Sequence, residues 1–464
     1  MTNRNLILLT DSYKASHYKQ YPPKTERIYS YFESRGGVFS DVVFFGLQYY
    51  LKEYLEGEVI TKAMVDEAEE LYAAHFGNKF IFNRAAWEYI IDAHRGRLPL
   101  CIKAVPEGLA VPTHNVLMTV ENTDLNCYWL TNYVETLLVQ VWYGCTVATQ
   151  SREIKKLMLR YLDETGSPEQ VNFKLHDFGF RGVSSVESAS IGGAAHLVNF
   201  MGTDTVAGLT FIQKYYKTTE MFGFSIPAAE HSTITSWGRD NEAEAYRNML
   251  RQYPTGLVAV VSDSYDIYNA CDKIWGEQLR NDVLERDGTL VVRPDSGNPK
   301  DVVLKVVSIL GEKFGYETNH KQFKVLNPKV RVIQGDGVNY DSIGDILETL
   351  KQHGWSSDNV AFGMGGALLQ KLDRDTQKFA FKCSSATVQG EELDVFKSPV
   401  TDNGKLSKRG RLKLVRDGNR YQTVSANSAG DDVMQTVFEN GVTLKEYTFS
   451  DVKTNADIQA HVVA

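Results

Sequence analysis

The chain has 464 residues, of which 43% are hydrophobic and 11% aromatic. Such a chain can bury a large core and is too long for one ordinary domain, so we expect two domains. The 50 Lys and Arg residues against 58 Asp and Glu residues give a net charge of -8. This charge disfavours nucleic acid as a partner, and any anionic ligand needs a local basic pocket.

Cysteine usage and hydropathy indicate a soluble cytoplasmic protein. The five cysteines include no Cys-x-x-Cys pair, which argues against a disulfide framework or a structural zinc site. The apolar run before Asp11 is only four residues long, too short for a signal-peptide core. Residues 128–148 are the most apolar region, but they carry polar side chains, and their apolar residues recur at helical spacing. We therefore expect a buried helix there and no membrane span.

In chain order, the first 165 residues combine helical and aromatic segments with short strand candidates. Helical spacing is predicted for 62–76, 128–142 and 151–162. From about His176 onward, short apolar runs end in Gly, Asp, Ser or Arg, and helical patterns over 301–315 and 342–354 separate several of them. This alternation predicts parallel strands whose polar ends form a site, as in a β/α barrel.

The tail after Ser385 returns to strand-like runs, including 411–424 with a turn at Asp417–Gly418. We assign 166–384 to an irregular β/α barrel. Residues 1–165 and 385–464 together form a second, mixed α+β domain built from both chain ends. The predicted fold class is α/β.

Two glycine-rich segments follow strand candidates, QGDGV at 334–338 and FGMGGALLQK at 362–371. Glycine lets a backbone approach an anion closely, and its N–H groups can bind phosphate. Neither segment matches a Walker A or a G-x-G-x-x-G pattern, which disfavours an ordinary ATPase or a Rossmann dehydrogenase. Plain tight turns remain the alternative.

Two further segments carry side chains suited to chemistry. In RPDSGNP (293–299), Arg293 and Asp295 alternate along a strand and so point the same way, toward a ligand or into a structural ion pair. PAAEHST (227–233) places Glu230 beside His231, which suits a base, a metal ligand or a phosphoryl acceptor, although a structural role is the alternative. No second histidine stands at metal spacing, so a zinc enzyme is disfavoured.

One aromatic segment and one basic segment are further candidates for ligand binding. HDFGFRG (176–182) offers Phe178 and Arg181 as a stacking face with a charge at its edge, with core packing as the alternative. KLSKRGRLK (405–413) has five basic residues in nine, which suits pyrophosphate or simply a solvated face. It lacks the interleaved aromatic residues that stack nucleic-acid bases.

Taken together, these segments resemble the nicotinamide phosphoribosyltransferases of the type II phosphoribosyltransferase family. The resemblance runs in order over nearly the whole chain through TDSYKASHY (10–18), YSYFESRG (29–36), HDFGFRGVSS (176–185), GTDTVAG (202–208), PAAEHST, SDSYDIYNACDKIWG (262–276), RPDSGNP, QGDGV and FGMGGALLQK. It implies an irregular β/α barrel plus a second domain, in a homodimer whose active sites are shared between subunits.

The resemblance also implies residue roles. Phe178 of one subunit and Tyr13 of the other would sandwich the nicotinamide ring, and Asp204 would accept from the carboxamide NH2. His231 would be a phosphohistidine, oriented by Glu230 and Asp263. The matches near ring, ribose and phosphates are Arg181, Arg293, Asp295, Gly335, Asp336, Gly365, Gly366 and Arg374, and the basic matches around the polyphosphate or ATP are Arg35, Lys371, Lys382, Lys397 and Lys405. His231, Asp204, Asp295 and Arg293 form the implied catalytic set.

The implied activity transfers phosphoribosyl from 5-phosphoribosyl 1-pyrophosphate to nicotinamide, giving nicotinamide mononucleotide for NAD salvage. It uses Mg2+ with the pyrophosphate, through ligands that the sequence does not identify, and ATP stimulates it through the phosphohistidine. A nicotinate-preferring transferase is the alternative, for which a basic residue should replace Asp204. A non-catalytic nucleotide-sensing barrel is a more remote alternative, and it should have lost the polar residues of the catalytic set.

Overall fold

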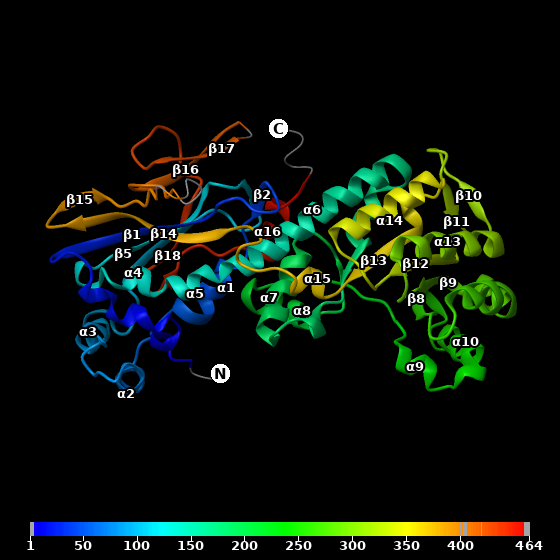
Figure 1. Cartoon of the computed structure of the whole chain (residues 1–464), viewed down its shortest axis with the longest axis horizontal. Helices are drawn as coiled ribbons and strands as arrows, with labels where there is room; N and C mark the ends of the chain where they lie inside the picture. The colour runs from blue at the N-terminus through cyan, green and yellow to red at the C-terminus, as the bar shows by residue number, and fades with distance from the viewer. Residues whose placement is uncertain (1–3, 400, 402–405, 419, 459–464) are drawn as a thin grey trace. The chain divides into compact units, whose positions relative to one another are not determined.

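The computed structural model describes residues 4–399, 401, 406–418 and 420–458 (Figure 1). The chain forms two compact units. Unit 1 comprises Met1–Thr149, Ile212–Thr218 and Asp373–Ala464, and unit 2 comprises Gln150–Phe211 and Thr219–Leu372. The domain boundaries at 165 and 384 stay a prediction. No helix among the described residues is long and apolar enough to cross a membrane.

Unit 1 is built on an antiparallel sheet of seven strands in the order β15-β14-β1-β5-β3-β18-β19. The strands are β1 (Thr25–Ser34), β3 (Leu100–Ala104), β5 (Val116–Asn122), β14 (Phe379–Val388), β15 (Glu391–Asp394), β18 (Gln435–Glu439) and β19 (Val442–Thr443). Strands from both ends of the chain therefore pair in one sheet, which confirms the predicted mixed domain. The expected turn at Asp417–Gly418 joins β16 (Leu412–Asp417) to β17 (Arg420–Ser425). A further small pair is β2 (Asp41–Val43) with β4 (Ala110–Pro112).

The helices of unit 1 follow the sequence pattern with one difference. They are α1 (Leu47–Tyr50), α2 (Lys62–Phe76), α3 (Arg84–His94), α4 (Leu130–Tyr133), α5 (Glu135–Val139) and α16 (Phe449–Asn455), while α6 (Val141–Thr165) begins in unit 1. The apolar stretch predicted as one helix is divided into α4, α5 and the start of α6. Lys14 Nζ donates to the Asn132 carbonyl at 2.9 Å and Thr10 Oγ1 to the Tyr133 carbonyl at 2.9 Å. These side chains bind carbonyl groups that a continuous helix would use itself.

Unit 2 contains a parallel sheet of six strands in the order β7-β6-β13-β12-β9-β8. They are β6 (Leu175–Asp177), β7 (Gly202–Thr203), β8 (Thr255–Val261), β9 (Asp287–Arg293), β12 (Val330–Gln334) and β13 (Val360–Met364). The helices include α7 (Val186–Leu197), α8 (Val206–Tyr215), α9 (His231–Thr235), α10 (Glu242–Gln252), α11 (Ile267–Asn269), α12 (Arg280–Glu285), α13 (Pro299–Phe314), α14 (Tyr340–Gln352) and α15 (Gly366–Leu369). β10 (Tyr316–Thr318) and β11 (Lys324–Leu326) form a separate small pair. The alternation of strand and helix confirms the predicted α/β class.

One short segment, 224–229, joins the two edges of this sheet. At the β7 edge, Thr203 N donates to the Phe224 carbonyl at 2.9 Å. At the β8 edge, Ala229 N donates to the Ala259 carbonyl at 2.9 Å, and Ala259 N donates to the Pro227 carbonyl at 2.9 Å. We call residues 224–229 the closing segment. Because it binds both edges, the sheet curls into the expected irregular barrel.

The closely paired start of β8 and β9 offers a test of the fold. A Cβ at Gly288 would lie 2.0 Å from the carbonyl oxygen of Gly256 and 2.5 Å from Arg286 Nη1. Gly288→Ala should therefore destabilise the protein by about 1–3 kcal/mol, the usual range for overpacking, as measured by urea unfolding. Gly344→Ala in α14 is the matched control, since its Cβ would meet only Leu157 at 3.8 Å. The control should be neutral or stabilising, and an equally stable Gly288→Ala variant would contradict the pairing.

Candidate functional site

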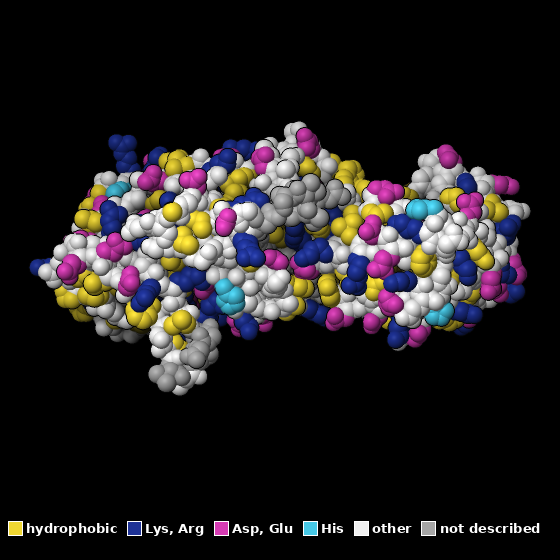
Figure 2. Space-filling view, turned by 90° about the horizontal axis from the view of Figure 1, so that it is seen from above, with side chains coloured by type: hydrophobic (Ala, Val, Ile, Leu, Met, Phe, Trp, Pro, Cys, Tyr) yellow, Lys and Arg dark blue, Asp and Glu magenta, His cyan; other side chains and the backbone are white. Residues whose placement is uncertain are grey.

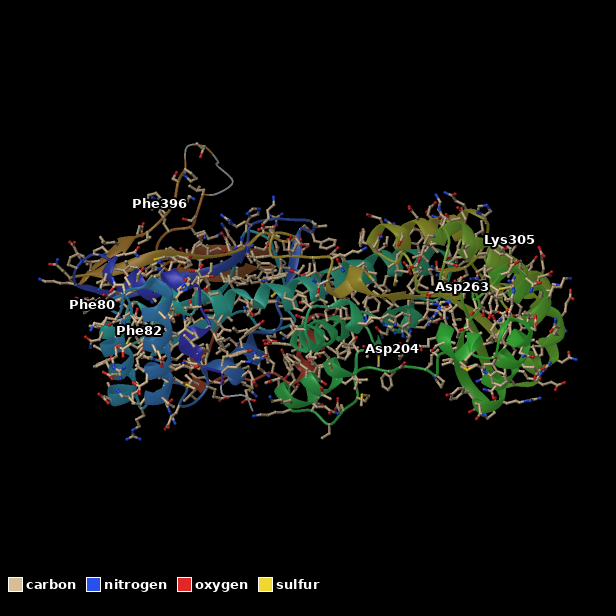
Figure 3. All side chains as sticks on the ribbon, turned by 60° about the horizontal axis from the view of Figure 1, so that its bottom comes forward. Phe80, Phe82, Asp204, Asp263, Lys305 and Phe396 are labelled. Carbon is tan, nitrogen blue, oxygen red and sulfur yellow. The ribbon has the colours of Figure 1, made fainter. Side chains whose placement is uncertain are left out.

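The predicted residues of unit 2, apart from Lys371, follow the carboxyl ends of its strands or the closing segment. Asp204 follows β7, Phe178 follows β6, Asp263 follows β8, and His231 lies just beyond the closing segment. Arg293 ends β9, and both glycine loops follow β12 and β13. Figure 3 labels Asp204 and Asp263 in this unit. The carboxyl ends of parallel strands are where such folds bind ligands, so the geometry supports one common site.

The Phe178 ring lies against Gly363 and Gly335 and is partly buried. A Cβ at Gly363, in β13, would lie 1.9 Å from Phe178 Cε2, so only glycine leaves room for this ring. The ring also packs against the barrel core formed by Ala259, Val291 and Ile333. Its backbone is fixed as well, because Phe178 N donates to the Met364 carbonyl at 3.0 Å. The ring is thus held rigidly with part of its surface exposed, as a stacking platform requires.

Asp204 is exposed, and neighbouring strand ends hold it in place. Its N–H donates to the Asp177 carbonyl at 2.9 Å. Its carboxylate Oδ1 accepts a hydrogen bond from Ser225 Oγ, in the closing segment. Asp204 therefore presents an oriented carboxylate that can accept from a further N–H donor.

Arg293 and Asp295 form a loose pair, with 3.7 Å between Arg293 Nε and Asp295 Oδ1. Arg293 Nε is buried and has no hydrogen-bond partner among the described residues. Burial raises the pKa of Asp295, Arg293 lowers it, and the carboxylates of Asp263 and Asp336 raise it further. A buried guanidinium nitrogen without a hydrogen bond and crowded carboxylates indicate that the site is completed by a ligand.

The glycine loops lie beside these groups. A Cβ at Gly335 would lie 3.0 Å from Asp295 Oδ1 and 3.7 Å from both Arg293 Cδ and Phe178 Cε2. Gln334 Nε2 donates to the Asp336 carbonyl at 2.7 Å and so shapes the turn that follows β12. Gly365 and Gly366 follow β13, and a Cβ at Gly366 would meet nothing within 4 Å. The loop therefore leaves open space beside Gly366.

His231 opens α9 with its side chain 46% exposed, and its Nε2 lies 2.9 Å from Asp263 Oδ1. Asp263 is itself oriented, because its Oδ2 accepts from Ser296 Oγ at 2.6 Å. The predicted contact of Asp263 with His231 is therefore present. The Glu230 carboxylate accepts instead from Ser232 Oγ. The Ser296–Asp263–His231 chain leaves one ring nitrogen of His231 available for reaction.

Unit 1 holds the remaining predicted residues. Tyr13 lies in the 3₁₀ helix Ser12–Lys19 with 56% of its surface exposed. Arg35 follows β1, Lys382 lies on the adjacent β14, Arg374 precedes β14 and Lys397 follows β15. We call Arg35, Arg374, Lys382 and Lys397 the basic cluster. Lys371, in unit 2, is exposed, and Lys405 lies outside the described residues.

The basic cluster gathers four cations, of which Arg374 is paired with Asp375. Burial lowers the pKa of Lys382, Glu135 partly offsets this, and the three other cations of the cluster lower the pKa further. Arg35 Nε is buried without a hydrogen-bond partner among the residues described. Elsewhere, Figure 2 shows basic and acidic side chains interspersed over the face it displays. Cations gathered in this way favour a bound polyanion.

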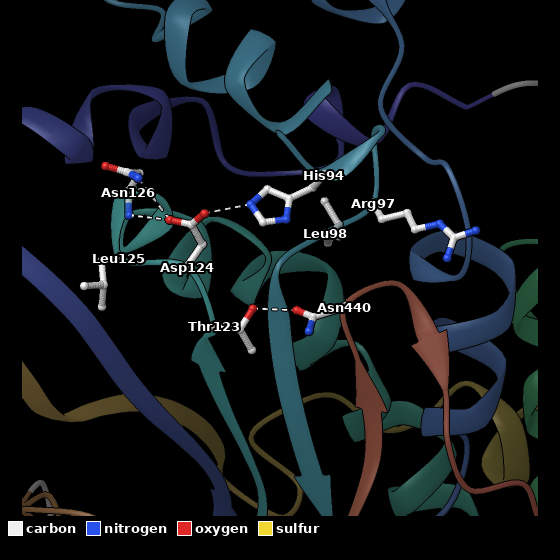
Figure 4. Close-up of a pocket in the computed structure, with 8 residues that line it drawn as sticks. All are labelled: His94, Arg97, Leu98, Thr123, Asp124, Leu125, Asn126 and Asn440. Carbon is white, nitrogen blue, oxygen red and sulfur yellow. Dashed lines mark hydrogen bonds and ion pairs between the residues drawn. The ribbon is translucent and has the colours of Figure 1, made fainter. Parts of the chain in front are cut away.

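The structure contains two sizeable cavities. One, of about 660 Å³, is lined by residues near the starts of strands, including Leu257, Thr289 and Arg331, and it extends to Ser225 and Ile226 of the closing segment. The other, of about 630 Å³, lies in unit 1 beside His94 and Asp124 (Figure 4). Although His94, Asp124 and Cys127 could hold a metal ion, Asp124 already accepts from Tyr89, His94 and the Asn126 N–H. We regard that group as a structural cap.

Comparisons with known proteins identify the family of this chain. Residues 173–442 match the nicotinate phosphoribosyltransferase family, and residues 5–102 match the nicotinamide phosphoribosyltransferase N-terminal domain. A nicotinamide phosphoribosyltransferase of Xanthomonas campestris pv. campestris (strain 8004) is 55% identical, over 98% of both chains. One of Acinetobacter baylyi (strain ATCC 33305 / BD413 / ADP1) is 33% identical, over 97% of this chain and 96% of its own.

Solved structures support the fold. A nicotinate-nucleotide pyrophosphorylase from Pyrococcus furiosus has a TM-score of 0.63 at 16% identity, covering 98% of this chain and 95% of its own. Human nicotinic acid phosphoribosyltransferase has a TM-score of 0.54 at 14% identity, covering 98% and 94%. Fold and site together define a type II phosphoribosyltransferase, which is a pentosyltransferase. The chain belongs to the nicotinate phosphoribosyltransferase family, among its nicotinamide phosphoribosyltransferase members.

Sequence analysis did not single out several residues of the site. Gly363 makes room for Phe178, Ser225 binds Asp204, and Ser296 binds Asp263. The glycine lies inside FGMGG, a segment whose pattern indicated only phosphate binding. The two serines show no distinctive pattern, since their roles depend on contacts between distant parts of the chain.

The basic cluster provides a prediction about charge. The pKa of Lys382 is lower in the folded state than in the unfolded state, so its charge destabilises the folded protein at neutral pH. This penalty would disappear as pH rises from the folded-state pKa to the ordinary value. Lys382→Met should therefore raise the melting temperature of the free protein but reduce the stabilisation given by inorganic pyrophosphate.

Lys445→Met, at an exposed position of unit 1 outside the cluster, is the control and should change neither quantity. Thermal unfolding with and without pyrophosphate measures both effects. Undiminished stabilisation of the Lys382→Met variant by pyrophosphate would argue against an anion site at the cluster.

Proposed function

We propose that this protein transfers phosphoribosyl from 5-phosphoribosyl 1-pyrophosphate to nicotinamide, giving nicotinamide mononucleotide and pyrophosphate for NAD salvage. The observation that carries this proposal is the oriented carboxylate of Asp204 at the strand ends that also hold the Phe178 ring. Membership of the family supports the transfer itself, and Asp204 supports the choice of acceptor. The names of the two relatives above agree with nicotinamide.

The acceptor would bind by stacking and by one directed hydrogen bond. Phe178 offers one face for the pyridine ring, and Tyr13 of a second copy of the chain would cover the other. Asp204 would accept from the carboxamide NH2. A nicotinate carboxylate about 4 Å from Asp204 would instead suffer roughly 4 kcal/mol of repulsion at an effective dielectric of 20. Asp204 therefore selects the amide over the acid.

The donor would lie along the glycine loops. Asp295 would accept from ribose hydroxyls, Arg293 and Arg181 would face the phosphates, and the N–H groups of the loops at Gly335 and Gly365 would bind phosphate oxygens. Asp336, Gly366 and Lys371 extend this cradle, and the basic cluster would bind the polyphosphate. We propose that Lys405 has the same role.

Transfer requires little proton movement. The lone pair of the pyridine nitrogen attacks ribose C1, and the bond to pyrophosphate breaks with its electron pair leaving on oxygen. Positive charge develops on the sugar and then on the ring nitrogen, while the cationic side chains stabilise the departing anion. Bound Mg2+ would supply additional charge neutralisation on pyrophosphate. Asp295 and Asp336 would hold such an ion, since the charge of Asp336 raises the pKa of Asp295 and a cation would relieve that repulsion.

ATP would act through His231. If the Nε2–H group of His231 donates a hydrogen bond to Asp263, the lone pair of Nδ1 can attack the γ-phosphorus of ATP. The N–P bond forms as the bond to ADP breaks, and water later hydrolyses the phosphohistidine. This sequence would couple ATP hydrolysis to the transfer. Glu230 would support the position of His231 through the start of α9.

The proposed function also includes an oligomeric state and a cellular location. We propose a homodimer, since Tyr13 is exposed and the resemblance assigns it to the site of a second copy. We propose a cytoplasmic location, because all five cysteines are free thiols, the state that a reducing compartment maintains. Both depend on the family assignment.

Acceptor choice provides the direct test. The kcat/KM with nicotinamide should exceed that with nicotinate at least a hundredfold, because roughly 3–4 kcal/mol of repulsion separates the two acceptors. Asp204→Asn keeps the shape of the side chain and removes its charge, so it should lower this ratio. Equal or better use of nicotinate by the unaltered enzyme would replace the proposal with the nicotinate alternative.

The role of His231 is tested separately. His231→Ala removes the only proposed phosphoryl acceptor, so the rate with ATP should equal the rate without it. Incorporation of the labelled γ-phosphoryl group into the protein should disappear as well. If ATP still stimulates the variant, the phosphohistidine role is wrong.

A further inference from the structure

Asp177 is a buried carboxylate beside the acceptor site that none of the roles above uses. It ends β6, has 0% of its surface exposed, and directly precedes Phe178. Its Oδ1 accepts from the Gly179 N–H at 2.7 Å. Its Oδ2 is buried and has no hydrogen-bond partner among the described residues. One oxygen thus fixes a turn, and no cationic side chain among the described residues neutralises the carboxylate.

Asp177 is linked directly to the acceptor-binding residues. Its main-chain carbonyl accepts from Asp204 N at 2.9 Å, and its Cα partners in the sheet are Thr203 on β7 and Met364 on β13. The next N–H along the chain, that of Phe178, binds Met364. Asp177 therefore lies where the chain segments carrying the ring platform and the selecting carboxylate meet.

The electrostatic state of Asp177 is consistent with this position. Burial raises its pKa to about 6, the Gly179 N–H and the Thr205 hydroxyl lower it, and the charge of Asp204 adds to the rise. Asp177 is therefore mainly ionised at neutral pH, and it lies close enough to Asp204 for the two charges to interact. His176, the neighbouring titratable group on β6, has its pKa lowered by burial and raised by Asp204. Two carboxylates therefore act on the same small region.

We propose that Asp177 is a second specificity-determining residue, whose buried charge acts with Asp204 to favour a neutral amide acceptor over an anionic one. This inference rests on the proposed function. An acid beneath the site repels a carboxylate acceptor without contacting it. The same field stabilises the positive charge that grows on the pyridine nitrogen as the bond to ribose forms. Asp177 is thus a positioning and electrostatic residue that does not touch the reacting atoms.

Asp177→Asn separates charge from structure. The variant keeps an oxygen for the Gly179 N–H and nearly the same shape, but it removes the charge. The ratio of kcat/KM for nicotinamide to that for nicotinate should fall about tenfold, the scale expected of a nearby charge in a partly shielded site. For nicotinamide, kcat should fall more than KM rises, because the charge acts mainly on the transition state.

Two further measurements keep the result interpretable. Asp358→Asn alters another buried acid of unit 2, which binds Ser167 near the start of β13, and it should leave the ratio unchanged. Thermal unfolding establishes that both variants fold. If Asp177→Asn folds and retains the ratio of the unaltered enzyme, Asp177 only fixes the turn and the inference is overturned.

The two proposals fail in different ways. The ratio in the unaltered enzyme tests the proposed function, whereas the change in that ratio on Asp177→Asn tests this inference. An enzyme that prefers nicotinate would overturn the first proposal, and the effect of Asp177 on that preference would still be measured. A loss of activity with both acceptors by the same factor would overturn the specificity role.

Discussion

The closing segment is the structural constraint on which the rest of the site depends. Residues 224–229 bind both edges of the parallel sheet, so the carboxyl ends of β7 and β8 must face the same enclosed space. The segment also supplies Ser225 to Asp204 and leads directly into His231, which contacts Asp263. One short run of backbone therefore positions groups at both edges of the barrel.

Charge is distributed to match the proposed substrates. Asp177 and Asp204 lie beside Phe178, where in the proposed reaction a neutral acceptor would become cationic. Arg293, proposed to face the donor, has a buried Nε with no hydrogen-bond partner among the residues described. In unit 1, the basic cluster raises the cost of keeping Lys382 protonated in the free protein. Like charges held close together destabilise the free protein, and a bound ligand of opposite charge relieves this repulsion, as expected of a binding site.

The helices and strands could be predicted because the spacing of apolar residues is a local property of the sequence. The α2, α13 and α14 helices appear where apolar spacing placed them, and polar residues do follow the strand ends. The apolar stretch after residue 128 is divided because Lys14 and Thr10, more than 100 positions away, bind its carbonyls. The roles of Gly363 and Ser225 were equally inaccessible, since a glycine that accommodates a distant ring has no local signature. Asp177 lies within the HDFGFRG segment, but only its burial and its proximity to Asp204 distinguish it from an ordinary turn residue.

The most direct test of the account is a crystal structure of the protein with nicotinamide mononucleotide. It should place the pyridine ring against Phe178, with the amide nitrogen about 2.7–3.2 Å from a carboxylate oxygen of Asp204. A ring bound away from Phe178, or an amide whose nitrogen points away from Asp204, would contradict the central claim that this carboxylate selects the acceptor.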